Sequence, residues 1–207
     1  MTQITKNILC FGDSNTWGLN PETGKRYDEN TRWTMLLNQQ LGSEYKVIEA
    51  GQPNRTLVNN PPFSGNLNGI SYLKPYLEQY EVSTIVIALG TNDLKKRFNL
   101  APVNIASGLA SLITSIKHFY ADGKLPNIVL FGPLFINPQH ALSNIYFNCH
   151  QKLQPLNAHF KRIAQEHVLN YVDISHLNAP FGCDGIHLNY QGHKQLCERL
   201  NRVISKL

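Results

Sequence analysis

The stretch that decides the fold is Ile8-Leu9-Cys10-Phe11-Gly12-Asp13-Ser14-Asn15-Thr16-Trp17-Gly18, close to the N-terminus. Its apolar run stops abruptly at small and polar residues, as expected of a buried parallel strand that ends in a turn. Open α/β sheets bind ligands beyond the carboxyl ends of their strands, so Ser14 would present its hydroxyl to a crevice. The plainer alternative is that Ser14 or Asn15 only caps a following helix.

Four further apolar segments predict strands, and the amphipathic segments between them predict helices. The strands are expected at 45–50, 84–89, 127–131 and 171–174, and the helices at 33–41, 73–80, 105–119, 147–168 and 196–207. Pro155 would either kink the fourth helix or mark its true first turn. This alternation predicts a three-layer α/β/α sandwich with a five-stranded parallel sheet.

The length and composition indicate one globular domain, residues 1–207, without stabilising metals or disulfides. No apolar run approaches the roughly 20 residues that span a bilayer, so we expect no membrane association. The first residues, 1–6, lack the order of a secretory signal, which predicts a cytoplasmic protein. The four cysteines are widely spaced and are therefore expected to be reduced thiols.

The charge pattern gives little support for nucleic acid or metal as a partner. The net charge is +5, but the basic residues are dispersed, and Lys95-Lys96-Arg97 is the single run of three. Such a short run is typical of a solvated face. The eight histidines show no HExxH or paired Cys/His spacing, so we predict neither a bound metal nor a cofactor.

Polar residues also follow the second and third predicted strands. Gly51 comes directly after the second strand, and Gly90-Thr91-Asn92-Asp93 follows the third. Gly51 could simply close a turn, and Asn92 and Asp93 are ordinary turn formers. Because the ends of parallel strands converge, these residues are also expected beside Ser14.

An acid and a histidine lie three residues apart in Asp184-Gly185-Ile186-His187, before the last helix. On one helical turn, this spacing would place both side chains on the same face. A histidine so held can take a proton from a serine hydroxyl, which needs such a base at neutral pH. Taken alone, the motif is more typical of a solvated polar turn than of a catalytic pair. Together with Ser14 and Asn92, it supplies a nucleophile, a base, an acid and oxyanion donors.

Four segments, those around Ser14, Gly51, Asn92 and His187, resemble the conserved blocks of the SGNH (GDSL) hydrolase family. The resemblance covers nearly the whole chain. It is strongest to the arylesterase and acyltransferase branch, through Thr16-Trp17-Gly18, Arg32-Trp33, Leu67-Asn68-Gly69 and the Asn92 segment. The resemblance implies a flavodoxin-like fold and a cofactor-independent serine esterase for small acyl esters, acetyl or aryl. Gln52-Pro53 departs from the small residues more frequent after the family's glycine, which puts the shape of that loop in doubt.

The resemblance also assigns roles residue by residue. It implies Ser14 as nucleophile, His187 as general base and Asp184 as the acid that orients the histidine. The oxyanion would be held by the backbone N–H groups of Ser14 and Gly51 and by the Asn92 amide. We expect Asp13 to be a structural hydrogen-bond acceptor and Cys183 to be a packed thiol.

Two alternatives remain open at this point. The acyl group could pass to an alcohol instead of water, or the chain could be a non-catalytic flavodoxin-like module that binds phosphate or flavin at the first helix. Specificity would reside in loops 19–31, 53–70 and 134–146, whose apolar members (Tyr27, Phe63, Leu134 and Phe135) suit a small acyl group or an aromatic alcohol. The length of the last two loops leads us to predict a homo-oligomer.

Overall fold

The computed structural model describes residues 5–58, 69–134, 136, 144–146, 148–174, 176–178 and 180–207. Five strands form one parallel sheet, in the order β2-β1-β3-β4-β5. They are β1 (Lys6–Gly12), β2 (Tyr45–Gly51), β3 (Val82–Ala88), β4 (Asn127–Phe131) and β5 (Asn170–Val172). The predicted five-stranded parallel sheet is confirmed, and this order is that of flavodoxin-like folds.

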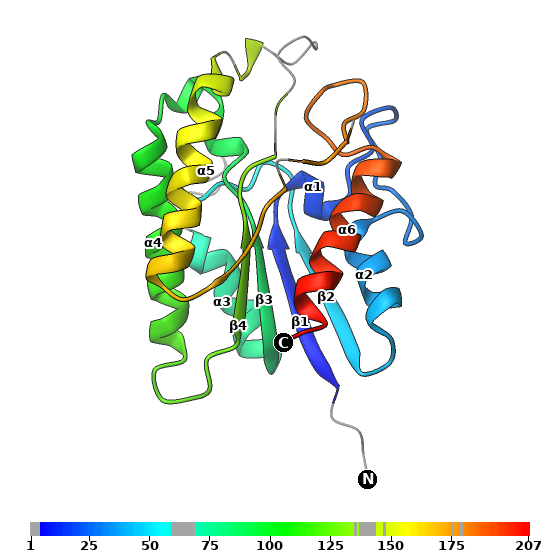
Figure 1. The fold of residues 1–207 in the computed structure, drawn as a ribbon, viewed down its shortest axis with the longest axis vertical. Coiled ribbons are helices and arrows are strands. Elements are labelled where there is room, and N and C mark those ends of the chain that lie inside the picture. Colours follow the sequence, from blue (N-terminus) through cyan, green and yellow to red (C-terminus); the bar gives the residue numbers. More distant parts are fainter. Residues whose placement is uncertain are drawn as a thin grey trace.

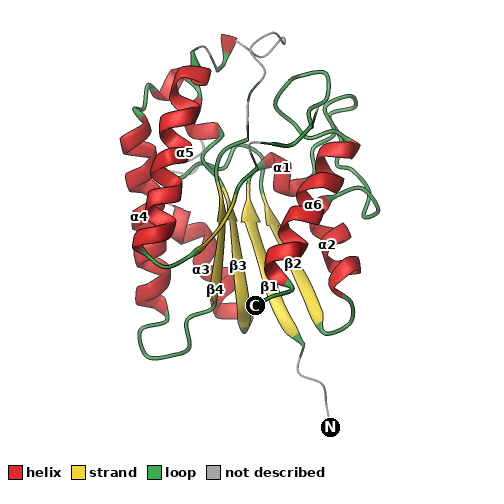
Figure 2. Ribbon diagram, in the orientation of Figure 1, coloured by secondary structure: helices red, strands yellow, loops and turns green. Residues whose placement is uncertain are grey.

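Helices cover both faces of the sheet (Figure 1). They are α1 (Ser14–Trp17), α2 (Trp33–Leu41), α3 (Gly69–Gln79), α4 (Pro102–Phe119), α5 (Cys149–Glu166) and α6 (Tyr190–Ile204), with 3₁₀ turns at Asn92–Leu94 and Lys96–Phe98. The helices α3, α4 and α5 lie on one face, and α2 and α6 lie on the other (Figure 2). The three-layer sandwich predicted from the alternation is therefore confirmed.

The sequences of the central strands are apolar throughout because helices cover both of their faces. In β1, Leu9 and Phe11 belong to the core beneath α3, α4 and α5, whereas Ile8 and Cys10 belong to the core beneath α2 and α6. Successive side chains of a strand point to opposite faces, so a strand covered on both sides must be apolar at every position. The same division holds in β3 from Ile85 to Ala88.

The register of the sheet brings the polar strand ends together. Gly12 at the end of β1 pairs with Gly51 on one side and with Ala88 on the other. The chain continues from β1 to α2 and from β3 to α4, which lie on opposite faces, so the boundary between these two neighbouring strands is the switch point at which such sheets bind ligands. Ser14 and Asn92 follow directly from these two strands.

Four of the five predicted helices differ from their predicted bounds, and only α2 keeps them: α3, α4, α5 and α6 were expected at 73–80, 105–119, 147–168 and 196–207. Helix α6 begins at Tyr190, where the Asn189 carboxamide caps it by accepting a hydrogen bond from Gly192 at 2.8 Å. Its polar first turn gave no apolar pattern, which is why the prediction began at 196. Pro155 lies well inside α5, so it is not in the first turn. Within the described ranges, no helix is long and apolar enough to cross a membrane.

Candidate active site

Ser14 is the first residue of α1, a single turn of helix that follows β1 directly. The cap is Asp13, whose carboxylate accepts a hydrogen bond from the Asn15 N–H at 2.9 Å. The turn ends at Gly18, whose φ of 86° is in the left-handed region that favours glycine. The interpretation of Ser14 or Asn15 as the cap is therefore wrong. Asp13 is a hydrogen-bond acceptor, as expected.

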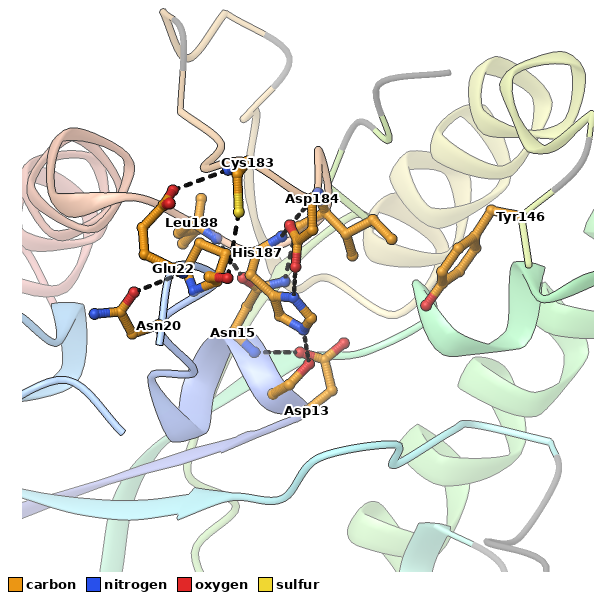
Figure 3. Close-up of polar contacts among 12 residues, drawn as sticks. Asp13, Asn15, Asn20, Glu22, Tyr146, Cys183, Asp184, His187 and Leu188 are labelled. Carbon is orange, nitrogen blue, oxygen red and sulfur yellow. Dashed lines mark hydrogen bonds and ion pairs between the residues drawn. The ribbon is translucent and has the colours of Figure 1, made fainter. Parts of the chain in front are cut away.

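A chain of hydrogen bonds joins Ser14, His187 and Asp184. His187 Nε2 lies 2.8 Å from Ser14 Oγ, and His187 Nδ1 lies 2.5 Å from Asp184 Oδ2. Figure 3 shows the imidazole beneath the Asp184 carboxylate. The structure thus brings together three side chains that come from opposite ends of the sequence, with the ring between the hydroxyl and the acid.

The Asp184–His187 segment is a turn, not the helical turn we predicted. Asp184 Oδ1 accepts hydrogen bonds from the N–H groups of Ile186 and His187, each at 2.9 Å. These bonds curl the backbone around the carboxylate, which leaves Oδ2 free to meet the ring. Gly185, at a φ of 71°, permits the turn. Aspartate two residues before a backbone donor competes with helix formation in this way.

Asp184 is held in its ionised form. Burial alone would raise the pKa of this carboxyl, but the hydrogen bonds from the His187 ring and from the backbone of His187 and Ile186 outweigh it and lower the pKa. An ionised carboxylate accepts the Nδ1 proton of the ring. In the tautomer that donates from Nδ1, His187 Nε2 is the acceptor that faces the Ser14 hydroxyl.

Asn92 is buried at the first 3₁₀ turn, beyond the end of β3. Its Nδ2 donates to the Arg55 carbonyl at 3.1 Å, and its Oδ1 accepts a hydrogen bond from the Tyr146 hydroxyl at 3.1 Å. The two bonds fix which way the amide faces. One of the two N–H bonds of Nδ2 is committed to Arg55, and the other is available to a ligand. Tyr146 was not predicted from the sequence, because nothing local links it to Asn92.

Gly51 is the last residue of β2 rather than part of a separate turn. A Cβ added at this position would lie 2.2 Å from Trp17 N and 2.5 Å from Thr16 C, both backbone atoms of α1. Such distances are well inside van der Waals contact, so only glycine allows α1 to pass over the end of β2. The close approach explains the residue type without reference to any ligand, and it keeps the Gly51 backbone against Thr16 and Trp17.

Buried charges brace the loops around Ser14. The Arg55 guanidinium donates to the Gly12 carbonyl at 3.0 Å and to the Ala50 carbonyl, which ties together the ends of β1 and β2. Asp93 accepts the N–H groups of Leu57 and Val58, each at 2.9 Å. Burial raises the pKa of both Asp13 and Asp93 to about 6. Arg55 was missed because a lone arginine in a polar loop carries no pattern.

The basic run at 95–97 is not wholly solvated. Lys95 is half-buried, and its Nζ donates to Asn54 Oδ1 at 2.7 Å, whereas Lys96 and Arg97 are exposed. Burial, assisted by the neighbouring Arg97 charge, lowers the pKa of Lys95 to about 8. The solvated-face interpretation is therefore wrong for Lys95.

Cys183 corrects another prediction, because its side chain is exposed and not packed. Its Sγ donates to the Pro21 carbonyl at 3.3 Å, and its N–H donates to the Glu22 carboxylate at 3.1 Å (Figure 3). Partial desolvation and then Glu22 raise the pKa of the thiol. A raised pKa lowers the thiolate fraction, which makes Cys183 a poor nucleophile at neutral pH.

A cavity of about 670 Å³ lies between α5, the ends of β4 and β5, and the segment before the Asp184 turn. Its walls are mostly apolar and include Leu134, Leu153, Ile174 and Phe181. Ser14 does not line it. Of the loop residues assigned to specificity, Leu134 is in this wall, Tyr27 packs edge-on against His193, and Phe63 and Phe135 lie outside the described residues.

The site contains no metal-binding cluster in the ranges for which side chains are given. In that part of the chain, no group of three or more His, Cys, Asp or Glu side chains is arranged to hold an ion. Asp184 and His187 instead form a hydrogen bond with each other, and His187 forms a second one with Ser14.

Comparison with known proteins identifies the family. The model of the GDSL-like lipase/acylhydrolase family matches residues 10–195. This span includes all four segments that carried the resemblance. No curated protein matched the chain at a significant level.

Solved structures agree over the full length. The inhibitor-bound aryl esterase of M. smegmatis is 32% identical, with a TM-score of 0.88, covering 98% of this chain and 100% of that one. Est24, a carbohydrate acetylesterase from Sinorhizobium meliloti, is 27% identical, with a TM-score of 0.87, covering 98% and 99%. A lipase/acylhydrolase from Enterococcus faecalis, 18% identical with a TM-score of 0.74 and covering 97% and 95%, shares the fold. The chain therefore belongs to the GDSL-like lipase/acylhydrolase family, in its arylesterase branch, and is a carboxylic ester hydrolase.

Proposed function

We propose that the chain hydrolyses small acyl esters through an acyl-enzyme on Ser14, with His187 as general base and Asp184 as the acid that orients it. One observation carries the proposal: His187 bridges the Ser14 hydroxyl, at 2.8 Å, and the Asp184 carboxylate, at 2.5 Å. A serine hydroxyl needs a neighbouring base because its own pKa is far above neutrality.

In the first step, Ser14 Oγ attacks the ester carbonyl carbon while its proton moves to His187 Nε2. The tetrahedral intermediate then collapses, the bond to the alcohol oxygen breaks, and the imidazolium gives its proton to the leaving alkoxide. In the second step, water attacks the acyl-enzyme with His187 again as base, and the acid leaves as Ser14 recovers its proton. The Asp184 carboxylate stays ionised throughout and stabilises the imidazolium.

The negative charge on the carbonyl oxygen needs donors that are already in place. We assign the backbone N–H groups of Ser14 and Gly51 and the second N–H of the Asn92 amide to this role. Asn92 is held from both ends, by Arg55 and Tyr146, so its amide does not have to reorient during the reaction. The pairing of Gly51 with Gly12, two residues before Ser14, supports its backbone as the second donor.

The substrate class is a small acyl ester, such as an acetate, of an aryl or sugar alcohol. The names of two neighbours above 25% identity, an aryl esterase and a carbohydrate acetylesterase, support this class. A panel of p-nitrophenyl esters from acetate to palmitate tests it. We expect the highest kcat/KM for acetate and a steep fall with chain length, and a maximum at palmitate would contradict the assignment.

The decisive test of the mechanism is Ser14→Ala, with Ser111→Ala as the control. Ser111 is an exposed serine of α4. We expect Ser14→Ala to lose esterase activity and labelling by a fluorophosphonate probe while keeping its melting temperature, and Ser111→Ala to keep all three. Activity retained in Ser14→Ala, or a probe adduct on Cys183, would remove Ser14 from its role.

The binding-module alternative is no longer supported, because the chain belongs to a hydrolase family. Transfer of the acyl group to an alcohol uses the same acyl-enzyme and remains the second outcome of the same chemistry. Its test is given below with the oligomeric state, which stays a prediction.

A further inference from the structure

The segment that carries His187 is separate from the sheet ends that carry Ser14. Asp184 and His187 lie in one turn, so their mutual geometry is set locally by hydrogen bonds within residues 184–187. Nothing local sets the distance from that turn to Ser14, 173 residues earlier in the chain. A contact between the two segments has to do so.

The Asn15 side chain makes that contact. Its Oδ1 accepts the Leu188 N–H at 2.9 Å, and its Nδ2 donates to the Ile186 carbonyl at 3.3 Å. The carboxamide therefore forms hydrogen bonds with the backbone on both sides of His187. Apart from the Ser14–His187 bond itself, these are the hydrogen bonds that join residues 13–16 to 184–188 in the described part of the chain.

Asn15 is itself immobilised. It is 5% exposed, its N–H donates to the Asp13 carboxylate at 2.9 Å, and its carbonyl accepts the indole N–H of the fully buried Trp33 at 3.1 Å. Figure 3 shows it between Asp13 and the Leu188 segment. Because the backbone of Asn15 is held in place, its side chain can hold the backbone of residues 186–188 at a defined position.

We propose that Asn15 is a positioning residue, whose carboxamide clamps the backbone around His187 and thereby sets the distance between His187 Nε2 and Ser14 Oγ. This inference rests on the proposed roles of Ser14 and His187. Its physical basis is that a misplacement of about 1 Å can cost on the order of 100-fold in rate even when the reacting groups are intact. Asn15 touches no reacting atom and acts only through the backbone of 186–188.

The test compares Asn15→Ala and Asn15→Asp with Asn38→Ala. The alanine removes both bonds, whereas aspartate keeps an acceptor for the Leu188 N–H and loses the donor to Ile186. Asn38 is a control of the same residue type, because its Oδ1 accepts the Val47 N–H at 2.8 Å and joins α2 to β2, away from the site. Asn38→Ala should lower the melting temperature without changing kcat.

We expect Asn15→Ala to lower kcat for p-nitrophenyl acetate by about 10- to 100-fold, with KM within about twofold, and to slow fluorophosphonate labelling in parallel. Asn15→Asp should fall between alanine and wild type. The strongly deshielded Nδ1 proton of the His187–Asp184 pair should persist in the ¹H NMR spectrum, because that bond is made within the turn. General disruption of the fold would remove this signal together with the activity.

A folded Asn15→Ala variant with kcat within threefold of wild type overturns the proposal, as does loss of the Nδ1 proton signal with the activity. If the alanine variant does not fold, Asn15→Asp takes its place, and a kcat equal to that of wild type, or loss of the Nδ1 proton signal with the activity, overturns the proposal. Failure of the proposed function has a different signature: Ser14→Ala would then retain activity, or the wild-type protein would take the probe on another residue.

Discussion

His193 gives a prediction of how stability depends on pH. The side chain lies on α6 and is fully buried. Its Nδ1 accepts the backbone N–H of Trp33 at 3.3 Å, and the Tyr27 ring lies edge-on, with the ring centres 5.3 Å apart. Burial, followed by the charges of Arg32 and His187, lowers the pKa of His193 to about 3. The folded protein therefore keeps this ring neutral at pH values at which the unfolded chain protonates it.

The magnitude follows from linkage. In the unfolded chain the pKa of a histidine is about 6.5, so at pH 4.5 the ring is two units below it and almost fully protonated. Each unit corresponds to about 1.4 kcal/mol, so His193 removes about 2–3 kcal/mol of unfolding free energy between pH 7.5 and 4.5. Its contribution is complete above the unfolded pKa and is lost as pH falls toward the folded pKa. For a chain of this size the loss corresponds to about 5–10 °C in Tm.

Two buried carboxyls act in the opposite direction. The pKa values of Asp13 and Asp93 are raised to about 6, so the folded state binds more protons than the unfolded one between about pH 4 and 6, and their contribution to stability increases as pH falls. The dependence of Tm on pH in the wild-type protein alone would combine the contributions of His193, Asp13 and Asp93. A variant that changes only His193 separates them.

The assay is the melting temperature of wild type and His193→Asn at pH 7.5 and 4.5, followed by circular dichroism. Asparagine can still accept the Trp33 N–H, but it cannot titrate. We expect the variant to be less stable than wild type at pH 7.5, with the difference shrinking by about 5–10 °C at pH 4.5. Parallel Tm curves for the two proteins would refute the reasoning.

The remaining predictions concern the reaction. Asn92→Ala should lower kcat by about 10²–10³-fold with little change in KM in steady-state assays, and a pure KM effect would exclude an oxyanion role. His187→Ala should reduce kcat more than Asp184→Ala, because the base transfers the proton and the acid only orients it; equal losses would contradict this division. Tyr146→Phe removes the bond that orients the Asn92 amide and should cost about 3- to 10-fold in kcat, whereas an unchanged kcat would show that the amide is held without it. Incubation with vinyl acetate and benzyl alcohol, with light scattering after size exclusion, should reveal benzyl acetate and a homo-oligomer; a monomer that releases only acetic acid would remove this prediction but not the Ser14 assignment.

The sequence was sufficient for the sheet because burial on both faces leaves a continuous apolar run. The strand through Ile85 and Val86 is the clearest case, since one residue packs under α4 and the other under α6. The convergence of parallel strand ends also predicted that Ser14 and Asn92 lie close together, whereas His187 does not directly follow a strand and its role came from the family resemblance.

What the sequence did not predict depends on contacts between distant segments. The bonds from Asn15 to Leu188 and from Tyr146 to Asn92 leave no periodic or local signal. The turn at Asp184 was misjudged as helical because a spacing of three suits a helical face as well as an Asp-centred turn. Only the two backbone N–H groups that bond to Asp184 distinguish them.

The site is built in two ways, and this has a consequence for how it fails. Ser14, Gly51 and Asn92 are fixed by the register of the central strands, in which Gly12 pairs with both Gly51 and Ala88. The Asp184–His187 pair is made within its own turn and meets them through Asn15. Perturbing the sheet ends should therefore weaken charge stabilisation while leaving the base in place. Perturbing the contact through Asn15 should leave both halves intact and still slow the reaction, because the proton transfer depends on their separation.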